Sequence, residues 1–93
     1  MADRTAMSAR IRGRVQGVGF RYHTRTQAVT LGVYGWVRNE PDGSVSVVAE
    51  GPEQAVQSFS NWLRKGPPGA RVDDIHIESR EAQGLFKRFS IEH

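Results

Sequence analysis

The segment GRVQGVGFR, residues 13–21, combines two residue types that together can bind an anion. Gly17 and Gly19 allow the backbone to take positive φ angles, so that consecutive N–H groups can point toward one ligand. Arg21 adds a permanent positive charge whose planar guanidinium matches phosphate oxygens. If the segment joins a strand to the start of a helix, the helix dipole also favours an anion there. The pattern therefore predicts a phosphate-binding loop, and the alternative is a tight turn followed by a surface arginine.

Two other phosphate-binding motifs do not fit this segment. A P-loop requires Lys followed by Ser or Thr after its last glycine, whereas Gly19 is followed by Phe20 and Arg21. The dinucleotide-binding fingerprint G-x-G-x-x-G fails because Tyr22 occupies the place of its third glycine. The sequence therefore predicts neither a nucleoside triphosphatase nor a dehydrogenase.

Hydrophobic periodicity places the loop between a strand and a helix. Residues 8–15 alternate between apolar or small residues and arginines, which is typical of a half-buried strand. Residues 21–31 are expected to form a helix that ends at Gly32. The expected apolar stripe of this helix is Tyr22, Thr26, Val29 and Val33.

The remaining segments complete an alternation of strands and helices. We expect strands at 33–39, 44–50, 72–80 and 87–92, a turn at EPDG (40–43), and a helix that Pro52 and Glu53 open and Gly66-Pro67-Pro68 ends. The order strand, helix, strand, strand, helix, strand, with a short additional strand, predicts an α+β ferredoxin-like (split βαβ) fold. Such a fold has an antiparallel sheet with two helices on one face.

This topology brings a second polar residue to the loop. The crossover rule makes the first two strands run in the same direction, with the third strand antiparallel between them. Their C-terminal ends therefore lie on one edge of the sheet, roughly 10 Å apart. Asn39 ends the second strand and is predicted to lie near the loop. An asparagine before a turn can also serve only to bond the local backbone, and that alternative stays open here.

The two segments resemble the acylphosphatase family. The resemblance rests on GRVQGVGFRYHT (13–24), LGVYGWVRNEPDGSVSVVAEGP (31–52) and FSI (89–91). It implies hydrolysis of the carboxyl-phosphate bond of small acyl phosphates to a carboxylate and inorganic phosphate, without a metal or another cofactor. The family's phosphate-binding loop corresponds to Gln16, Gly17, Val18, Gly19, Phe20 and Arg21, its essential arginine to Arg21, and its essential asparagine to Asn39.

Length and composition limit the kind of protein in which this site can lie. A chain of 93 residues suits one domain, for which we expect a flexible tail at 1–7 and a single folded unit at 8–93. The absence of cysteine excludes disulfides and thiolate chemistry. No apolar run approaches the ~20 residues of a membrane span, and the first residues lack the apolar segment of a signal peptide. We therefore predict a cytoplasmic protein that does not interact with membranes and acts as a monomer.

The chain carries 13 Lys and Arg against 10 Asp and Glu, with arginines concentrated near the start, which favours an anionic partner. An RNA-recognition module has the same element order, but the strand SVSVVAE (44–50) lacks the aromatic residues that stack on bases, so nucleic-acid binding is not expected. A domain that binds carbamoyl phosphate in a larger enzyme and a noncatalytic phosphate sensor remain as alternatives.

Histidine and tryptophan offer no competing site. The histidines at 23, 76 and 93 lack the spacing of metal ligands, and His23 is expected on the surface of the first helix. Trp36 and Trp62 are interpreted as packing residues, and Phe20 as an anchor of the loop in the core.

Overall fold

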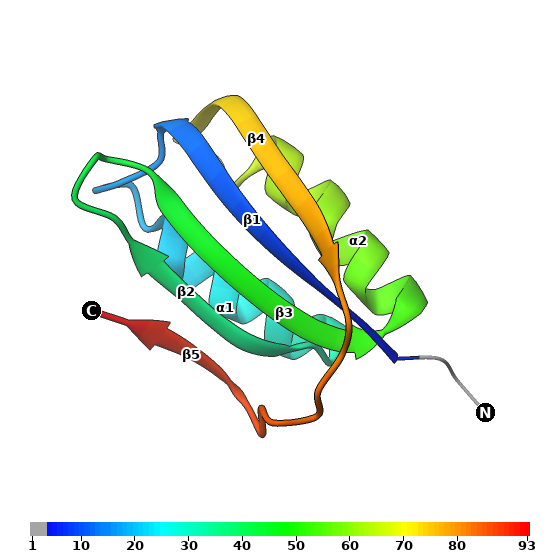
Figure 1. Ribbon diagram of the computed structural model, residues 1–93. Coiled ribbons are helices and arrows are strands. Elements are labelled where there is room, and N and C mark those ends of the chain that lie inside the picture. Colours follow the sequence, from blue (N-terminus) through cyan, green and yellow to red (C-terminus); the bar gives the residue numbers. More distant parts are fainter. Residues whose placement is uncertain (1–3) are drawn as a thin grey trace.

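The computed structural model describes residues 4–93 and contains one five-stranded sheet with both helices on the same face (Figure 1). The elements are β1 (Arg4–Arg14), α1 (Phe20–Leu31), β2 (Tyr34–Asn39), β3 (Val45–Pro52), α2 (Glu53–Lys65), β4 (Arg71–Arg80) and β5 (Phe89–Glu92). The strand order is β4-β1-β3-β2-β5. The predicted ferredoxin-like fold is thereby confirmed, with the turn and both helix ends where the sequence indicated.

The sheet is mixed because its last strand runs parallel to its neighbour. β3 lies antiparallel between β1 and β2, as predicted, and β1 also pairs antiparallel with β4. β5, in contrast, pairs parallel with β2. β1, β2 and β5 therefore run in the same direction, and their C-terminal ends meet at one edge of the sheet (Figure 1).

The first strand begins earlier than the sequence pattern indicated. It starts at Arg4, so the predicted flexible tail is wrong for residues 4–7, while residues 1–3 lie outside the described part. Ala6 and Met7 are buried and pair with Glu50 and Ala49 of β3. The cause is the length of β3, whose backbone extends far enough to pair with a segment that has no clear alternation of its own.

The predicted apolar stripe of α1 is also wrong. Tyr22 and Val29 are 62% and 63% exposed, and the buried residues are Phe20, Thr24 and Ala28. The helix packs through this i, i+4, i+8 row because the Thr24 hydroxyl donates to the Phe20 carbonyl at 2.7 Å, which satisfies the one polar group in the row. Because threonine and alanine are only weakly hydrophobic, the sequence pattern did not indicate that Thr24 and Ala28 form the buried face of α1.

The core lies between the sheet and the two helices. α2 contributes Val56, Phe59 and Leu63, and the Phe59 ring meets the Phe89 ring edge-on with centroids 5.7 Å apart. Trp62 packs against this core, as predicted. No helix among the described residues has the length and apolar character needed to cross a membrane.

Two positions of β2 depart from ordinary packing. Trp36, which the sequence suggested as a packing residue, is half-buried on the sheet face that the helices leave uncovered, outside the core. Gly35 has φ of 147°, and a Cβ built on it would lie 1.9 Å from the carbonyl oxygen of Val48. Only glycine therefore fits at this point of the β2–β3 pair.

A matched pair of leucines tests where the core lies. Leu63→Ala is expected to lower the free energy of unfolding by about 2–5 kcal/mol, because Leu63 is fully buried. Leu85→Ala should change it by less than about 0.5 kcal/mol, because Leu85 is 72% exposed. Urea unfolding followed by circular dichroism measures both, and equal losses would contradict this description of the core.

Candidate active site

The connection between β1 and α1 depends on two glycines in the left-handed region. Gly17 has φ of 76° and Gly19 has φ of 74°, which confirms the positive φ angles expected from the sequence. A Cβ built on Gly17 would meet nothing within 4 Å. Glycine is therefore needed at this position for its backbone conformation and not for close packing.

The N-terminus of α1 presents unpaired backbone donors. Gly19 caps the helix without any side-chain hydrogen bond, and the first turn contains no acidic residue. The first bond of the helix runs from the His23 N–H to the Gly19 carbonyl at 3.0 Å. The N–H groups of Phe20, Arg21 and Tyr22 precede that bond and have no acceptor within the helix. This end of the helix can therefore receive an anion.

Gln16 ties the loop to the β2–β3 hairpin. Its side-chain amide donates to the carbonyl oxygens of Glu40 and Ser44, both at 2.9 Å. This side chain does not line the hollow described below, although the sequence assigned Gln16 to the phosphate-binding loop. Gln16 instead fixes the loop against the hairpin that follows Asn39.

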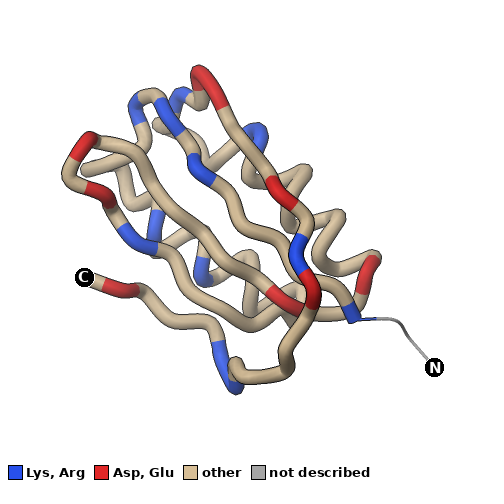
Figure 2. The backbone as a smooth tube through the Cα atoms, viewed as in Figure 1, with Lys and Arg blue, Asp and Glu red and all other residues tan. Residues whose placement is uncertain are grey.

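The hairpin between β2 and β3 is also held by charged groups, and Figure 2 shows acidic residues on it and basic residues on β1. The Ser44 hydroxyl and the Ser44 N–H both donate to the Asp42 carboxylate, and the Arg12 guanidinium lies 3.0 Å from it. These donors, chiefly the hydroxyl, hold the pKa of Asp42 well below its usual range. The Asp42 carboxylate therefore remains charged at neutral pH and keeps its place in the turn.

Asn39 stands at the end of β2 with an unused acceptor. Its side-chain Oδ1 is buried and has no hydrogen-bond partner anywhere in residues 4–93. The alternative of a simple turn residue would require this oxygen to accept a bond from the nearby backbone. A buried acceptor without a protein partner is uncommon and suits a site that bonds water or a ligand.

The structure gathers most of the predicted residues around one hollow of about 310 Å³. It is lined by Val15, Gly17, Gly19, Phe20, Arg21, Tyr22, Asn39, Ile91 and His93. Val18 packs partly buried against the core instead. Phe20 is only 2% exposed, in accord with its expected role as an anchor of the loop.

The last strand forms a wall of this hollow that the sequence did not reveal. Arg21 donates through Nη1 to the Glu92 carbonyl at 3.3 Å and lies 3.4 Å from Nδ1 of His93. Ile91 adds an apolar surface beside them. The missing signal was the direction of β5, because only a parallel pairing with β2 carries these residues to the edge where Asn39 and the loop lie.

The histidines are spread over the surface. His76 bonds Glu78 at 3.1 Å on the outer strand, and His23 is exposed on α1. Within residues 4–93, no three His, Asp or Glu side chains come close enough together to hold a metal ion.

A model of the acylphosphatase family matches residues 7–91. The chain belongs to the acylphosphatase family. The acylphosphatase of Pyrobaculum aerophilum is 52% identical over 82 residues, which are 87% of this chain and 86% of that protein. The crystal structure of the Bacillus subtilis acylphosphatase has a TM-score of 0.91 and 40% identity, and the match covers 96% of this chain and 99% of that one. Acylphosphatases hydrolyse acyl phosphates, so the family assignment gives the chain a hydrolase activity on an acid anhydride.

A further similarity concerns a larger protein. The crystal structure of full-length HypF matches with a TM-score of 0.90 and 28% identity, over 100% of this chain but only 12% of that chain. The acylphosphatase fold therefore occurs both in proteins of this length and as a small part of a longer one.

The two bonds of Gln16 provide a test of how the acylphosphatase loop is held. Gln16→Glu keeps the shape of the side chain but replaces its donor by an oxygen that faces two carbonyl groups. We expect the free energy of unfolding to fall by about 1–3 kcal/mol at neutral pH. Amide hydrogen exchange should quicken at residues 16–21. Unchanged exchange in this loop would contradict the anchoring role.

Proposed function

We propose that this acylphosphatase binds the phosphoryl group of its substrate in the loop of residues 16–21 and orients the attacking water with Asn39. The observation that carries the proposal is the combination of unpaired helix N–H groups and the Arg21 guanidinium with a buried, unpartnered Asn39 Oδ1 around one hollow. The substrate supplies the anion, and the hollow supplies donors for it.

The phosphoryl group would be held by charge and by geometry. In phosphoryl transfer the negative charge is spread over the three equatorial oxygens, and catalysis consists mainly of positioning and charge stabilisation. The backbone N–H groups at the start of α1 and the free donors of Arg21 would meet those oxygens. The bond from Arg21 to the Glu92 carbonyl supports this role, because it holds the guanidinium beside the helix end before substrate arrives.

Asn39 is neutral at every accessible pH and would therefore position the water without acting as a base. Its Oδ1 would accept a hydrogen bond from the water, directing the water oxygen in line with the bond to be broken. The water oxygen forms the new bond to phosphorus as the bond from phosphorus to the acyl oxygen breaks. The electron pair of that bond stays on the carboxylate, and a phosphate oxygen takes the proton of the water.

No metal has a step in this scheme, since a carboxylate is already a good leaving group. We also propose that the chain acts as a monomer in the cytoplasm, where inorganic phosphate or a similar anion would occupy the same loop.

Substitution of the two polar residues should abolish most of the hydrolysis of benzoyl phosphate measured with a chelator present. Arg21→Gln is expected to lower kcat by about 10³-fold or more, and Asn39→Ala by about 10²–10³-fold. Arg25→Gln serves as the matched control, because Arg25 is an exposed arginine on the same helix that does not line the hollow. Circular dichroism checks that each variant is folded. Loss of the wild-type activity on adding chelator would contradict the metal-free scheme.

Inorganic phosphate should stabilise the protein through the same loop. At a concentration of about 100 Kd it is expected to raise the free energy of unfolding by about 2.7 kcal/mol, visible as a higher Tm. Arg21→Gln should lose most of this gain. An equal gain in the variant would place the phosphate elsewhere. A wild-type protein that gains stability but does not hydrolyse benzoyl phosphate would favour a phosphate sensor or a domain of a larger enzyme. The similarity to a small part of HypF supports the second of these alternatives.

A further inference from the structure

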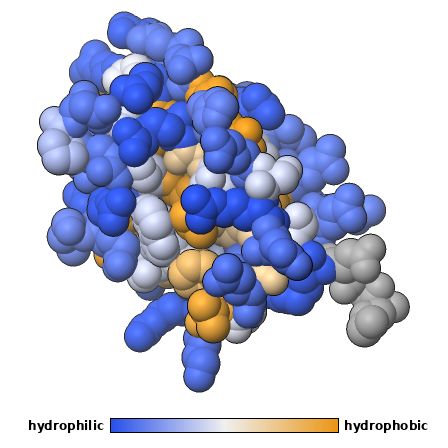
Figure 3. Space-filling view, in the orientation of Figure 1, coloured by the Kyte–Doolittle hydropathy of each residue, from blue (hydrophilic) through white to orange (hydrophobic). Residues whose placement is uncertain are grey.

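A second hollow lies on the sheet face that the helices leave uncovered. Its volume is about 320 Å³, at the lower end of the range found for small-molecule sites. Figure 3 shows this face with apolar surface in its middle and hydrophilic side chains around it. Side chains alternate along β2, so Arg38 belongs to this face while Asn39 lines the candidate active site. The two hollows are therefore separate.

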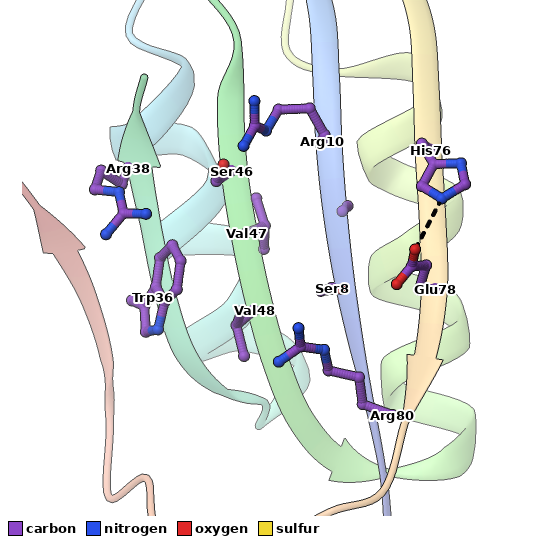
Figure 4. A pocket seen from close by; sticks show the side chains of 11 residues that line it. Ser8, Arg10, Trp36, Arg38, Ser46, Val47, Val48, His76, Glu78 and Arg80 are labelled. Atoms are coloured by element: carbon purple, nitrogen blue, oxygen red, sulfur yellow. Dashed lines mark hydrogen bonds and ion pairs between the residues drawn. The ribbon is translucent and has the colours of Figure 1, made fainter. Parts of the chain in front are cut away.

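The register of the strands creates the hollow. Two rows of residues cross the sheet from β4 to β2. In both rows the residue on β3 has a small or medium-sized side chain. The rows are Glu78, Ser8, Val48 and Trp36, and then His76, Arg10, Ser46 and Arg38. Large side chains from β2 and β4 thus rise on either side of a low floor, as Figure 4 shows.

Arginines supply most of the charged side chains that line the hollow. Figure 4 shows Arg10 and Arg80 extending over the sheet from opposite ends of the hollow toward β3. With Arg38 they make three arginines, against Glu78 as the one carboxylate in the lining. That carboxylate is already bonded to His76 at 3.1 Å. Two of the arginines have carboxylates just outside the lining, since Arg38 Nε lies 3.0 Å from Glu40 and Arg10 lies 3.6 Å from Asp42. Arg80 is therefore the lining arginine without a paired carboxylate among the described residues, and its charge favours a bound anion.

Two of these arginines can turn toward a ligand. Arg80 is exposed and forms no ion pair with any residue in the described part of the chain. Arg10 lies 3.6 Å from Asp42 and 3.3 Å from the Ser44 hydroxyl, with its side chain 41% exposed. Neither contact uses all five N–H donors of the guanidinium. A phosphate between these two side chains would accept from the N–H donors that these contacts leave unused.

The wall formed by β2 offers a flat surface beside this charge. The guanidinium carbon of Arg38 lies 4.7 Å from the centre of the Trp36 ring, within the range of a cation–π pair. Trp36 is half-buried and does not belong to the hydrophobic core. Aromatic rings and arginine planes together are the surfaces on which nucleobases stack.

We propose that this hollow binds a nucleoside monophosphate, with the base against Trp36 and Arg38 and the phosphate between Arg10 and Arg80. A mononucleotide suits the site better than a nucleic-acid strand because the wall provides one stacking surface. A strand needs successive aromatic residues, and the β3 residues that line this face, Ser46 and Val48, carry no aromatic ring. The site is distinct from the loop that the proposed hydrolysis uses.

Titration of the ¹⁵N-labelled protein with adenosine 5′-monophosphate, followed by NMR, tests the proposal. We expect saturable shifts of the Trp36 indole N–H and of the Arg38 and Ser46 amides. Adenosine alone and inorganic phosphate alone should each bind at this face with a Kd at least about tenfold higher than that of the nucleotide, because each engages half of the site.

Variants separate the two halves of the site. Arg80→Gln and Trp36→Leu are each expected to weaken binding of the nucleotide about tenfold. Arg64→Gln is the matched control, since this exposed arginine in the last turn of α2 does not line the hollow, and it should leave the affinity unchanged. Arg80→Gln and Trp36→Leu should keep the hydrolysis of benzoyl phosphate. Arg80→Gln decides the test if Trp36→Leu does not fold, because Arg80 is exposed.

Four results would overturn the proposal. The first is the absence of saturable shifts at millimolar nucleotide. The second is a set of shifts confined to residues 16–21 and Asn39, and the third is inorganic phosphate binding at the open face as tightly as the nucleotide does there. The fourth is a single-stranded oligonucleotide that shifts the open face when the mononucleotide does not.

Discussion

The shared direction of β1, β2 and β5 is the constraint on which the candidate active site depends. β1 and β2 each pair antiparallel with β3, which lies between them, and β5 pairs parallel with β2. Each of the three strands therefore delivers its C-terminal end to the same edge. The glycine loop, Asn39 and the backbone of Glu92 meet there without any long connection, although they are far apart in the sequence.

Local interactions then convert this proximity into a fixed arrangement. Gln16 bonds the loop to the hairpin after β2, and Asp42 keeps that hairpin closed through Ser44 and Arg12. Phe20 anchors the start of α1 in the core. These bonds hold the loop and the hairpin in place without a ligand, so the proposed binding of a phosphoryl group would require little reorganisation. Such preorganisation is the main source of catalysis by electrostatic stabilisation.

The sequence predicted the parts of the molecule whose signals are local. The glycines of the loop, the turn at EPDG and the strong periodicity of α2 each determine structure over a few residues, and the element order then placed Asn39 beside the loop. The error at residues 4–7 arose where a distant partner decides, because this segment becomes a strand by pairing with β3. The error in α1 has a local cause, because the Thr24 hydroxyl donates to the Phe20 carbonyl of the same helix and a polar residue can then occupy the buried row.

The direction of β5 and the position of Trp36 could not be predicted from the sequence, because both depend on partners that are distant along the chain. A four-residue strand carries no sign of its pairing direction, and an isolated tryptophan on an alternating strand suits either face. The wall of the active-site hollow and the open-face hollow therefore emerged only from the arrangement in space.

Gly35 helps to keep the side chains of β2 on their proper faces, with Arg38 on the open face and Asn39 beside the loop. A slip of β2 by one residue against β3 would exchange the faces, sending Asn39 outward and Arg38 toward the helices. It would also place Tyr34 or Trp36 where the Val48 carbonyl leaves room for no Cβ. The backbone conformation of Gly35 therefore favours the observed alignment of β2 with β3, in which Asn39 and Arg38 lie on opposite faces of the sheet.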